Sequence, residues 1–510
     1  MQIENQSEAI AFLRAELARI DSADAVRTVE THISLVFIAR TLAWKLKKAV
    51  RHPYLDFSTA ERRLAFCERE LLLNRRTAPG LYRHVRRLTR NTDGRLALDG
   101  KGSLVDAVLE MARFDDGRLL DRLAQRGELT PRLVTRLAAI VVGFHAAAAR
   151  SADEAASGSE RVAAVLRINE AGLEAARNLF GDGPVAELVA ATSNLWERHR
   201  PLLDERQRAG CVRLCHGDLH LRNIVEIDGE PVLFDCLEFD EEMATTDTLY
   251  DLAFLLMDLW HRDLRPLSNL LFNRYLDGAD EIPGLPLLPL FLAMRATVRA
   301  HVLATQAVEG SAEGREATAK ESRAYLDLAR DLLTPSPARL IAIGGYSGSG
   351  KSTTAAAIAH DVGAPPGARI LCSDRIRKRL FGVQPETRLP LEAYRPEVSA
   401  QVYALQREEA GKVLATGQSV IADAVFDRLE ERTAIETLAR KMGTPFVGIW
   451  LEAPEPTLVE RIAHRRGDPS DATSDVVRIQ LLHDLGPLDW LKVDSTAKDA
   501  GRRIEEAIQA

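Results

Sequence analysis

Residues 345–352 read Gly-Tyr-Ser-Gly-Ser-Gly-Lys-Ser, which is a complete G-x-x-x-x-G-K-S loop. The apolar run Leu340–Gly344 precedes this loop, and the helix-forming stretch Thr353–Ala357 follows it. A strand, a glycine-rich turn and a helix start form a cradle for anions, because glycine lets backbone N–H groups converge on phosphate oxygens. In such a cradle Lys351 neutralises the outer phosphates and the Ser352 hydroxyl binds Mg²⁺. The segment therefore constrains the surrounding chain to a strand–loop–helix unit.

The alternative is an ordinary Gly/Ser turn, which would need neither the Lys-Ser pair nor the flanking strand and helix. We therefore predict that this phosphate loop (residues 345–352) binds ATP with Mg²⁺. The expected nucleotide contacts are Gly345, Ser347, Gly348, Ser349, Gly350, Lys351, Ser352 and Thr353.

The length of 510 residues exceeds what one hydrophobic core usually supports, so two or more domains are expected. Hydrophobic residues make up 46% of the chain and charged residues 28%, so each domain can bury a core. The formal net charge of −7 gives no general affinity for nucleic acid or anionic membranes. No long charge-free apolar run predicts a membrane span, and the first residues lack the features of a secretory signal. We therefore expect a cytoplasmic protein with no membrane partner.

Two prolines mark the best candidate for a domain boundary. Pro335 and Pro337 follow a charged helical segment and end it, because proline cannot continue a helix. We predict a first domain at residues 1–333, a linker at 334–338 and a second domain at 339–510.

The second domain alternates predicted strands and helices, which indicates a parallel α/β sheet with helices on both faces. The first domain has a mixed start and is mostly helical over residues 130–330, which indicates an α+β fold. The predicted elements of the second domain are strands at Leu340–Gly344, Ala368–Ser373, Ser419–Asp423 and Pro445–Leu451, and helices at Glu397–Ala415 and Leu429–Lys441.

A second signature of phosphate chemistry lies in the first domain. Residues 216–223 read His-Gly-Asp-Leu-His-Leu-Arg-Asn, with Asp218 and Asn223 spaced as in a kinase catalytic loop. A hairpin with a turn at Asp228-Gly229 is expected next, and it delivers Asp235. In this chemistry Asp218 orients or deprotonates the acceptor hydroxyl, while Asn223 and Asp235 hold Mg²⁺. The loop, the hairpin and the second aspartate together predict a kinase-like site.

On these residues the first domain resembles the aminoglycoside phosphotransferase and choline kinase branch of the protein-kinase-like fold, which has H-G-D where protein kinases have H-R-D. The resemblance implies a small β-rich lobe at about residues 1–110, a helical lobe at about 111–333, and ATP between them.

The same resemblance assigns roles in the small lobe. Lys45, in Ala-Trp-Lys, matches the strand lysine that grips the nucleotide phosphates, and Lys47 is the alternative because it points to the same strand face. The ion-pair partner of this strand lysine is expected to be Glu70, with Glu68 as the alternative. Asp251 is interpreted as a structural residue of the helix that follows the metal-binding aspartate.

Some features of the first domain leave alternatives open. No G-x-G-x-x-G precedes Lys45, which departs from the protein-kinase pattern. Glu110-Met111 is placed at the hinge that binds adenine. Arg295 and Arg299 share a helix face and either receive an anionic group or are simply solvated. The acidic run at 238–242 either serves a cationic substrate or is an exposed loop.

The second domain resembles the P-loop kinases of small molecules and nucleic-acid ends, including polynucleotide 5′-kinase, gluconate kinase, chloramphenicol phosphotransferase and zeta-type toxins. Asp374 and Arg377 match a D-x-x-R motif, which makes Asp374 a candidate base and Arg377 a contact to substrate or phosphate. Arg461 and Arg465 match the lid helix of this group, where guanidinium groups stabilise the migrating phosphoryl. Asp423, at a strand end, is expected to reach Mg²⁺ through water.

The two signatures predict a bifunctional ATP-dependent phosphotransferase that acts on hydroxyl groups of small-molecule acceptors at two separate sites. One alternative is a polynucleotide or nucleoside kinase at the second site, to which the first domain presents the substrate. The acidic net charge counts against a long nucleic-acid footprint, so a nucleic-acid end is the less favoured acceptor. A further alternative is a nucleotide-sensing regulatory protein, although the completeness of Asp218, Asn223 and Asp235 argues against it.

Overall fold

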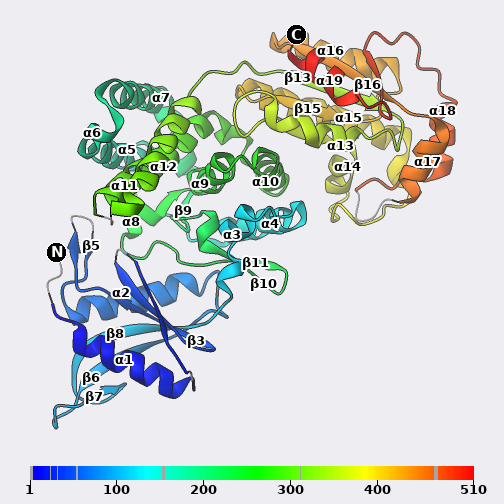
Figure 1. The fold of residues 1–510 in the computed structure, drawn as a ribbon. Helices are drawn as coiled ribbons and strands as arrows, with labels where there is room; N and C mark the ends of the chain where they lie inside the picture. The colour runs from blue at the N-terminus through cyan, green and yellow to red at the C-terminus, as the bar shows by residue number, and fades with distance from the viewer. Residues whose placement is uncertain are drawn as a thin grey trace. The chain divides into compact units, whose positions relative to one another are not determined.

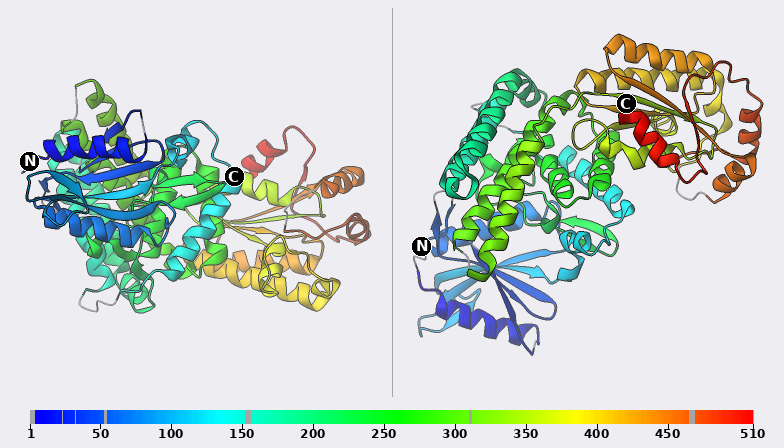
Figure 2. Two further views of the ribbon diagram at one scale, coloured as in Figure 1. Left: turned by 90° about the horizontal axis from the view of Figure 1, so that it is seen from below. Right: turned by 45° about the horizontal axis from the view of Figure 1, so that its top comes forward.

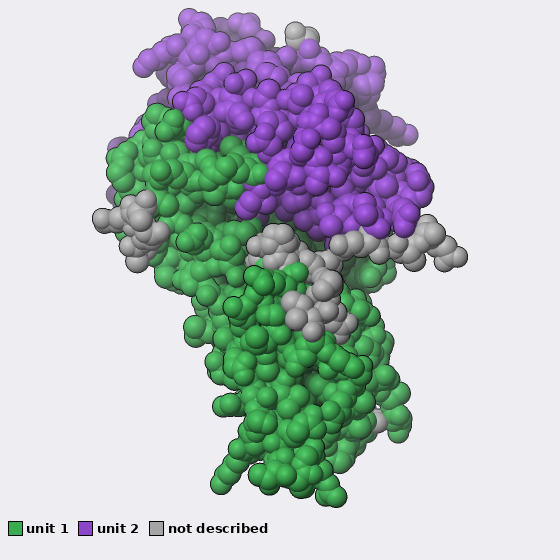
Figure 3. Space-filling view, turned by 90° about the vertical axis from the view of Figure 1, so that its left-hand side faces the viewer, with its two compact units in different colours: residues 1–167, 200–258 green, residues 168–199, 259–510 purple. Residues whose placement is uncertain are grey.

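The computed structural model describes residues 4–22, 24–31, 33–52, 55–151, 156–309, 312–464 and 469–509. The chain divides into two compact units (Figure 3). The first comprises residues 1–167 and 200–258, and the second comprises residues 168–199 and 259–510.

In the described part of the first unit, six strands form an antiparallel sheet in the order β1-β2-β3-β8-β6-β7 (Figure 1). Strand β3 pairs with β2 and β8, and Lys45 lies opposite Val36 and Leu109. The strands of this sheet are β1 Arg27–Glu30, β2 Ser34–Ile38, β3 Leu42–Lys47, β6 Tyr82–Arg90, β7 Leu96–Leu98 and β8 Ser103–Ala112.

Alternation along β3 sends its side chains to opposite faces of the sheet. Leu42, Trp44 and Leu46 join a core that includes helix α1 (Ser7–Ile20). Lys45 and Lys47 therefore point to the other face, where they meet helix α2 (Ala60–Asn74). Helix α2 begins after Thr59, whose hydroxyl accepts a hydrogen bond from the N–H of Arg62.

The predicted hairpin of the first unit is confirmed. Strands β10 (Ile224–Ile227) and β11 (Glu230–Leu233) pair through a turn in which Asp228 and Gly229 have φ of +51° and +82°. The helices α5 Gly158–Ala175, α7 Asp182–Arg208 and α9 Thr248–His261 contribute residues to both units. The other elements of the first unit are β4 Arg51–His52, β5 Leu55–Asp56, α3 Leu120–Gln125, α4 Pro131–Ala147, β9 Val212–Leu214, α8 Glu241–Ala244 and β12 Thr245–Asp247.

The helical part of the second unit includes α6 Arg177–Phe180, α10 Arg265–Gly278, α11 Leu288–Glu309 and α12 Ala312–Asp331. Helices α11 and α12 pack side by side (Figures 1 and 2). By length and composition, the stretch Ile282–Val308 is apolar enough to cross a membrane. However, 72% of its most apolar 18-residue segment is buried inside the structure. A buried core helix passes the same test, so this stretch is weak evidence for a membrane span.

The described residues of the second unit also form a sheet of five parallel strands in the order β14-β15-β13-β16-β17. Residues of α13 and α19 join the core on one face, and α15 and α16 contact strands of the sheet from the other face (Figure 2). The strands are β13 Leu340–Gly345, β14 Arg369–Cys372, β15 Val420–Asp423, β16 Phe446–Glu452 and β17 Leu491–Asp494. The helices are α13 Lys351–Ile358, α14 Ser373–Leu380, α15 Pro396–Ala415, α16 Leu429–Met442, α17 Glu455–Ala463, α18 Ser474–Leu481 and α19 Ala500–Gln509.

The predicted fold class is confirmed, with an α+β part that carries a β-rich region and a parallel α/β sheet that carries the phosphate loop. The sequence analysis did not predict β17, a four-residue strand at the sheet edge. The predicted linker at 334–338 lies inside the second unit, which also contains α10, α11 and α12. The boundaries at 1–333 and 339–510 stay a prediction.

Candidate active sites

In the first unit, two neighbouring lysines of β3 share one buried carboxylate. The Lys45 Nζ donates to Glu70 Oε1 at 2.8 Å and to Asp235 Oδ1 at 2.7 Å. The Lys47 Nζ donates to Glu70 Oε2 and to Glu238 Oε1, both at 2.6 Å. Burial alone would raise the pKa of Glu70, but the two ammonium groups lower it to about 2. Glu70 thus pairs with both candidate lysines, and Lys45 is the one that reaches the predicted metal ligand Asp235.

The catalytic loop (residues 216–223) and the hairpin bring the other predicted residues together. The Asn223 Nδ2 donates to the backbone oxygen and to Oδ2 of Asp218, both at 2.9 Å. The N–H of Phe234 donates to the backbone oxygen of Asn223 at 3.0 Å, so Asp235 follows directly beside the loop. The amide oxygen of Asn223 and the carboxylate of Asp235 are hard oxygen donors of the type that Mg²⁺ prefers, so these residues fit a magnesium ion.

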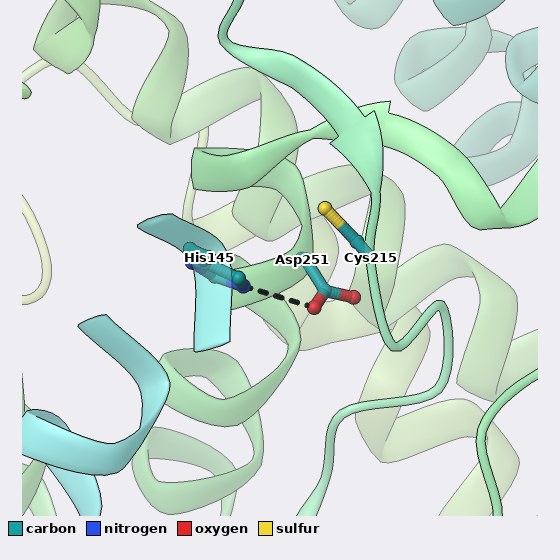
Figure 4. Close-up of side chains that lie close together, drawn as sticks. All are labelled: His145, Cys215 and Asp251. Atoms are coloured by element: carbon teal, nitrogen blue, oxygen red, sulfur yellow. Dashed lines mark hydrogen bonds and ion pairs between the residues drawn. The ribbon is translucent and has the colours of Figure 1, made fainter. Parts of the chain in front are cut away.

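Asp251 accepts hydrogen bonds from the backbone of the catalytic loop. Its carboxylate is fully buried and accepts hydrogen bonds from the N–H groups of His216 at 3.2 Å and Gly217 at 2.8 Å. Figure 4 shows His145 and Asp251 facing each other beside Cys215, and His145 Nε2 lies 3.1 Å from Asp251 Oδ2. The ligand atoms of these three residues lie within 4.8 Å of one another, as in a metal site. The bonds from the loop backbone favour the structural role that we expected for Asp251.

The structure shows the surroundings of the remaining candidates of the first predicted domain, and the hinge role of Glu110 and Met111 stays a prediction. Glu110 and Met111 lie inside strand β8, and Trp44 Nε1 donates to Glu110 Oε2 at 3.1 Å. Arg295 is buried, and the guanidinium of Arg299 lies over the ring of Tyr325 at 5.6 Å. These arginines are therefore not simply solvated.

The acidic run at 238–242 is not merely an exposed loop. Glu238 is buried against Lys47, as described above. The Asp240 carboxylate accepts the N–H of Met243 at 3.0 Å and caps α8, and Glu241 forms an ion pair with Arg69.

In the second unit, the phosphate loop joins β13 to α13 as predicted. Its glycines 345, 348 and 350 have φ of +140°, +87° and +97°. A Cβ at Gly345 would lie 2.5 Å from the backbone oxygen of Leu451, and one at Gly348 would lie 2.5 Å from that of Leu458. Only glycine fits both the conformation and the space.

The loop opens into a pocket of about 860 Å³. The Ser352 Oγ donates to Asp423 Oδ2 at 2.6 Å, and Asp423 ends strand β15 as predicted. Both are oxygen donors that suit Mg²⁺. The Lys351 Nζ donates to the backbone oxygen of Tyr346 at 3.1 Å. The predicted residues that line this pocket are Ser347, Gly348, Ser349, Gly350, Lys351, Ser352, Thr353, Asp374, Arg377, Asp423 and Arg461.

Asp374 enters the pocket at the first turn of α14. Burial, and then the charge of Asp423, raise the pKa of Asp374. Arg377 donates to the backbone oxygen of Ala393 at 2.6 Å, and its guanidinium lies 4.8 Å from the ring centre of Tyr394. In this structure Arg377 therefore holds the segment at Ala393 and Tyr394 against helix α14.

Of the two predicted lid arginines, Arg461 reaches the phosphate loop. Its Nη1 lies 2.9 Å from Ser495 Oγ and 3.4 Å from the backbone oxygens of Gly348 and Ser349. Arg465 lies outside the described residues.

Several residues that line the pocket of the second unit were not predicted. The Gln480 Oε1 accepts the N–H of Ser347 in the phosphate loop at 2.8 Å. His483 Nδ1 lies 2.6 Å from Asp427 Oδ2. Asp471 accepts hydrogen bonds from Lys378 at 2.5 Å and from the Tyr394 hydroxyl at 2.6 Å. These contacts join distant segments, and no local motif in the sequence marks them.

Comparisons with known families match two separate regions of the chain, and the first match extends into the second unit. Residues 88–285 match the family described as the phosphotransferase enzyme family, and residues 340–483 match the family described as the AAA domain. Uncharacterized proteins of Mycobacterium bovis and Mycobacterium tuberculosis are 29% identical to this chain over 486 residues, which cover 94% of this chain and 92% of each relative.

Among solved structures, a choline/ethanolamine kinase family protein from Mesorhizobium loti is 14% identical with a TM-score of 0.37, and covers 63% of this chain and 99% of its own. A putative kinase from Chloroflexus aurantiacus is 24% identical with a TM-score of 0.27, and covers 34% of this chain and 98% of its own. A gluconokinase from Sinorhizobium meliloti is 22% identical with a TM-score of 0.24, and covers 34% of this chain and 94% of its own. The family matches confirm the predicted union of a phosphotransferase region with a P-loop region.

Proposed function

We propose that this chain, which joins a phosphotransferase-family region to a P-loop region, is a bifunctional ATP-dependent phosphotransferase. Each site transfers the γ-phosphate of ATP to a hydroxyl group of a small-molecule acceptor. One observation carries the proposal: in each unit a candidate base lies with the residues that fit Mg²⁺ and the phosphates. Asp218 contacts Asn223 in the first unit, and Asp374 shares a pocket with Lys351, Ser352 and Asp423 in the second.

At the first site, Asp218 would accept the proton of the acceptor hydroxyl. Asn223 holds this carboxylate in place through its Nδ2. Lys45, which Glu70 orients, would bind phosphate oxygens. Asn223 and Asp235 would hold the Mg²⁺, which neutralises charge on the transferred phosphoryl group.

At the second site, the N–H groups of the phosphate loop and Lys351 would bind the phosphates of ATP. Ser352 and Asp423 would hold the Mg²⁺. Asp374 would take the acceptor proton, and its raised pKa makes it a stronger base than an ordinary aspartate. Arg461 lies against the loop, where a guanidinium stabilises charge that develops during transfer.

The test is a radiolabelled γ-phosphate transfer screen with sugars, aminoglycosides, nucleosides and RNA 5′-ends, on wild type, Asp218→Ala and Asp374→Ala. A product lost only in Asp218→Ala belongs to the first site, and a product lost only in Asp374→Ala belongs to the second. Transfer that survives in both variants, or no labelled acceptor in any class, contradicts the proposal. In the latter case, ATP binding by both units would favour a nucleotide-sensing protein.

One observation favours the polynucleotide form of the second candidate, a kinase that acts on nucleic-acid ends at the second site. Besides Arg377, the residues Arg388 and Arg428 line the same pocket, and arginines suit an acceptor that carries phosphate. A 5′-hydroxyl oligonucleotide and the matching free nucleoside, compared in the same screen, separate this candidate from a small neutral acceptor.

A further inference from the structure

Helix α10 presents a stripe of polar side chains to the outer edge of the parallel sheet. Asn269, Asn273 and Asp277 are four residues apart, so they share one face of the helix. Both asparagines are only 2% exposed. The strand that they contact is β14, which stands at one end of the strand order. An edge strand needs partners for its outward N–H and C=O groups.

The side-chain amide of Asn273 takes the place of a neighbouring strand. Its Oδ1 accepts the N–H of Ile370 at 2.7 Å, and its Nδ2 donates to the backbone oxygen of Ala368 at 3.1 Å. Asn269 Nδ2 donates to the same oxygen at 3.0 Å. Residues 368 and 370 face outward, because the N–H of Arg369 pairs with the β15 side of the sheet. The edge is therefore hydrogen-bonded to α10.

Asp277 extends this stripe to the start of helix α14, which carries the candidate base Asp374 of the second site. Its carboxylate pairs with Arg369 at 2.7 Å, Arg274 at 2.9 Å and Arg375 at 3.3 Å. Burial alone would raise the pKa of Asp277, but the three guanidinium groups, Arg369 first, lower it. Asp277 is therefore ionised at neutral pH. Arg375 lies in the first turn of α14 and directly follows Asp374, the candidate base.

We propose that Asp277 is a positioning residue for the second site, which it serves by holding the first turn of α14, and with it Asp374, through Arg375. This inference rests on the proposed phosphotransfer at that site. The asparagines fix α10 to β14, and Asp277 then fixes the start of α14 relative to that strand. Helix α10 lies in the region that matches the phosphotransferase family, whereas Asp374 lies in the region that matches the AAA domain. A helix of one region thus supports the active site of the other.

The mechanical part is tested by hydrogen–deuterium exchange on the full-length chain. Asp277→Asn removes the negative charge that pairs with the three arginines. Arg375→Ala removes only the ion pair with α14, and Asp277 keeps its ion pair with Arg369. We expect exchange in residues 373–380 to become about tenfold faster in both variants. Exchange in β13 should stay at the wild-type rate, as should α14 in the control Asp280→Asn, which changes an exposed carboxylate three residues away. Wild-type exchange of α14 in Arg375→Ala would overturn the proposal.

The catalytic part is tested on any product that Asp374→Ala abolishes. Both variants should lower kcat about 10- to 100-fold with an unchanged KM for ATP, because the phosphate loop is untouched and only the base is misplaced. The double variant should lose no more kcat than Asp277→Asn alone, since that variant already removes the ion pair of Asp277 with Arg375. A joint loss of ATP affinity and kcat, or a wild-type kcat, would overturn the positioning role. If Asp374→Ala abolishes no product, the proposed function fails instead, and the exchange experiment still decides the contact.

Discussion

At the scale of single residues, the protonation of Glu431 sets the charge on the wall of the pocket in the second unit. Glu431 lines this pocket together with Asp427 and His483. Burial, and then the charge of Asp427, raise the pKa of Glu431 to about 7. His483 pairs with Asp427 at 2.6 Å and not with Glu431, so the histidine does not offset this rise directly. The pocket wall therefore gains a negative charge as the pH rises through neutrality.

The wild-type protein should lose stability relative to Glu431→Gln as the pH rises from about 4.5 to about 7. In this window the folded carboxyl keeps a proton that the unfolded carboxyl releases, so a rise in pH favours unfolding. Below this window both states are protonated, and above it both are ionised, so the difference levels off. Thermal unfolding midpoints across the window measure it. Glu430→Gln, at an exposed neighbour, is the control and should follow wild type; parallel curves for wild type and Glu431→Gln would contradict the raised pKa.

At the scale of elements, the phosphate loop packs directly on the backbone of helix α17. Gly348 has a φ of +87°, and a Cβ on it would lie 2.5 Å from the backbone oxygen of Leu458 in α17. The same helix carries Arg461, whose Nη1 lies 3.4 Å from the backbone oxygen of Gly348. The loop conformation and the position of α17 are therefore coupled.

Gly348→Ala should weaken ATP binding at the second site by at least about tenfold. The substitution adds left-handed strain of about 1–2 kcal/mol and a clash with backbone that cannot move alone, so the loop must shift. Gly443→Ala is the matched control, because Gly443 has a φ of +64° with nothing within 4 Å of a new Cβ, and it should keep wild-type binding. Calorimetric titration with ATP in a Lys45→Met background isolates the second site. Equal affinities of the two variants would show that this loop does not hold the phosphates.

The elements that the sequence predicted are those encoded by neighbouring residues. The phosphate loop is marked by its glycines, and the hairpin by Asp228-Gly229. Contacts between distant residues were not predicted, such as Lys47 with Glu238, which are 191 residues apart. The sequence favoured Lys45 but kept Lys47 as the alternative, because residues two apart on a strand share a face, and in the structure both lysines reach Glu70. Asp277 was missed because two of its partners, Arg369 and Arg375, lie across the predicted linker.

At the scale of the whole molecule, each unit contains its own set of candidate residues for nucleotide binding. The first has Lys45, Glu70 and Asp235 in direct contact. The second has the phosphate loop with Ser352 bonded to Asp423. We therefore expect that each site can bind ATP when the other site is disabled.

The full-length chain should bind two ATP molecules in the presence of Mg²⁺. Lys45→Met removes the lysine that pairs with Glu70 and Asp235 and should leave one binding event, and Lys351→Ala should leave the other. The double variant should bind none, because each lysine supplies the positive charge that its site offers to the phosphates. Lys101→Met, at an exposed lysine of the first unit, is the control for loss of a positive charge and should keep both events. Calorimetric stoichiometry measures the outcome. A single event in wild type that only one of the two substitutions abolishes would restrict ATP to one unit, and the remaining site would then have to act without nucleotide.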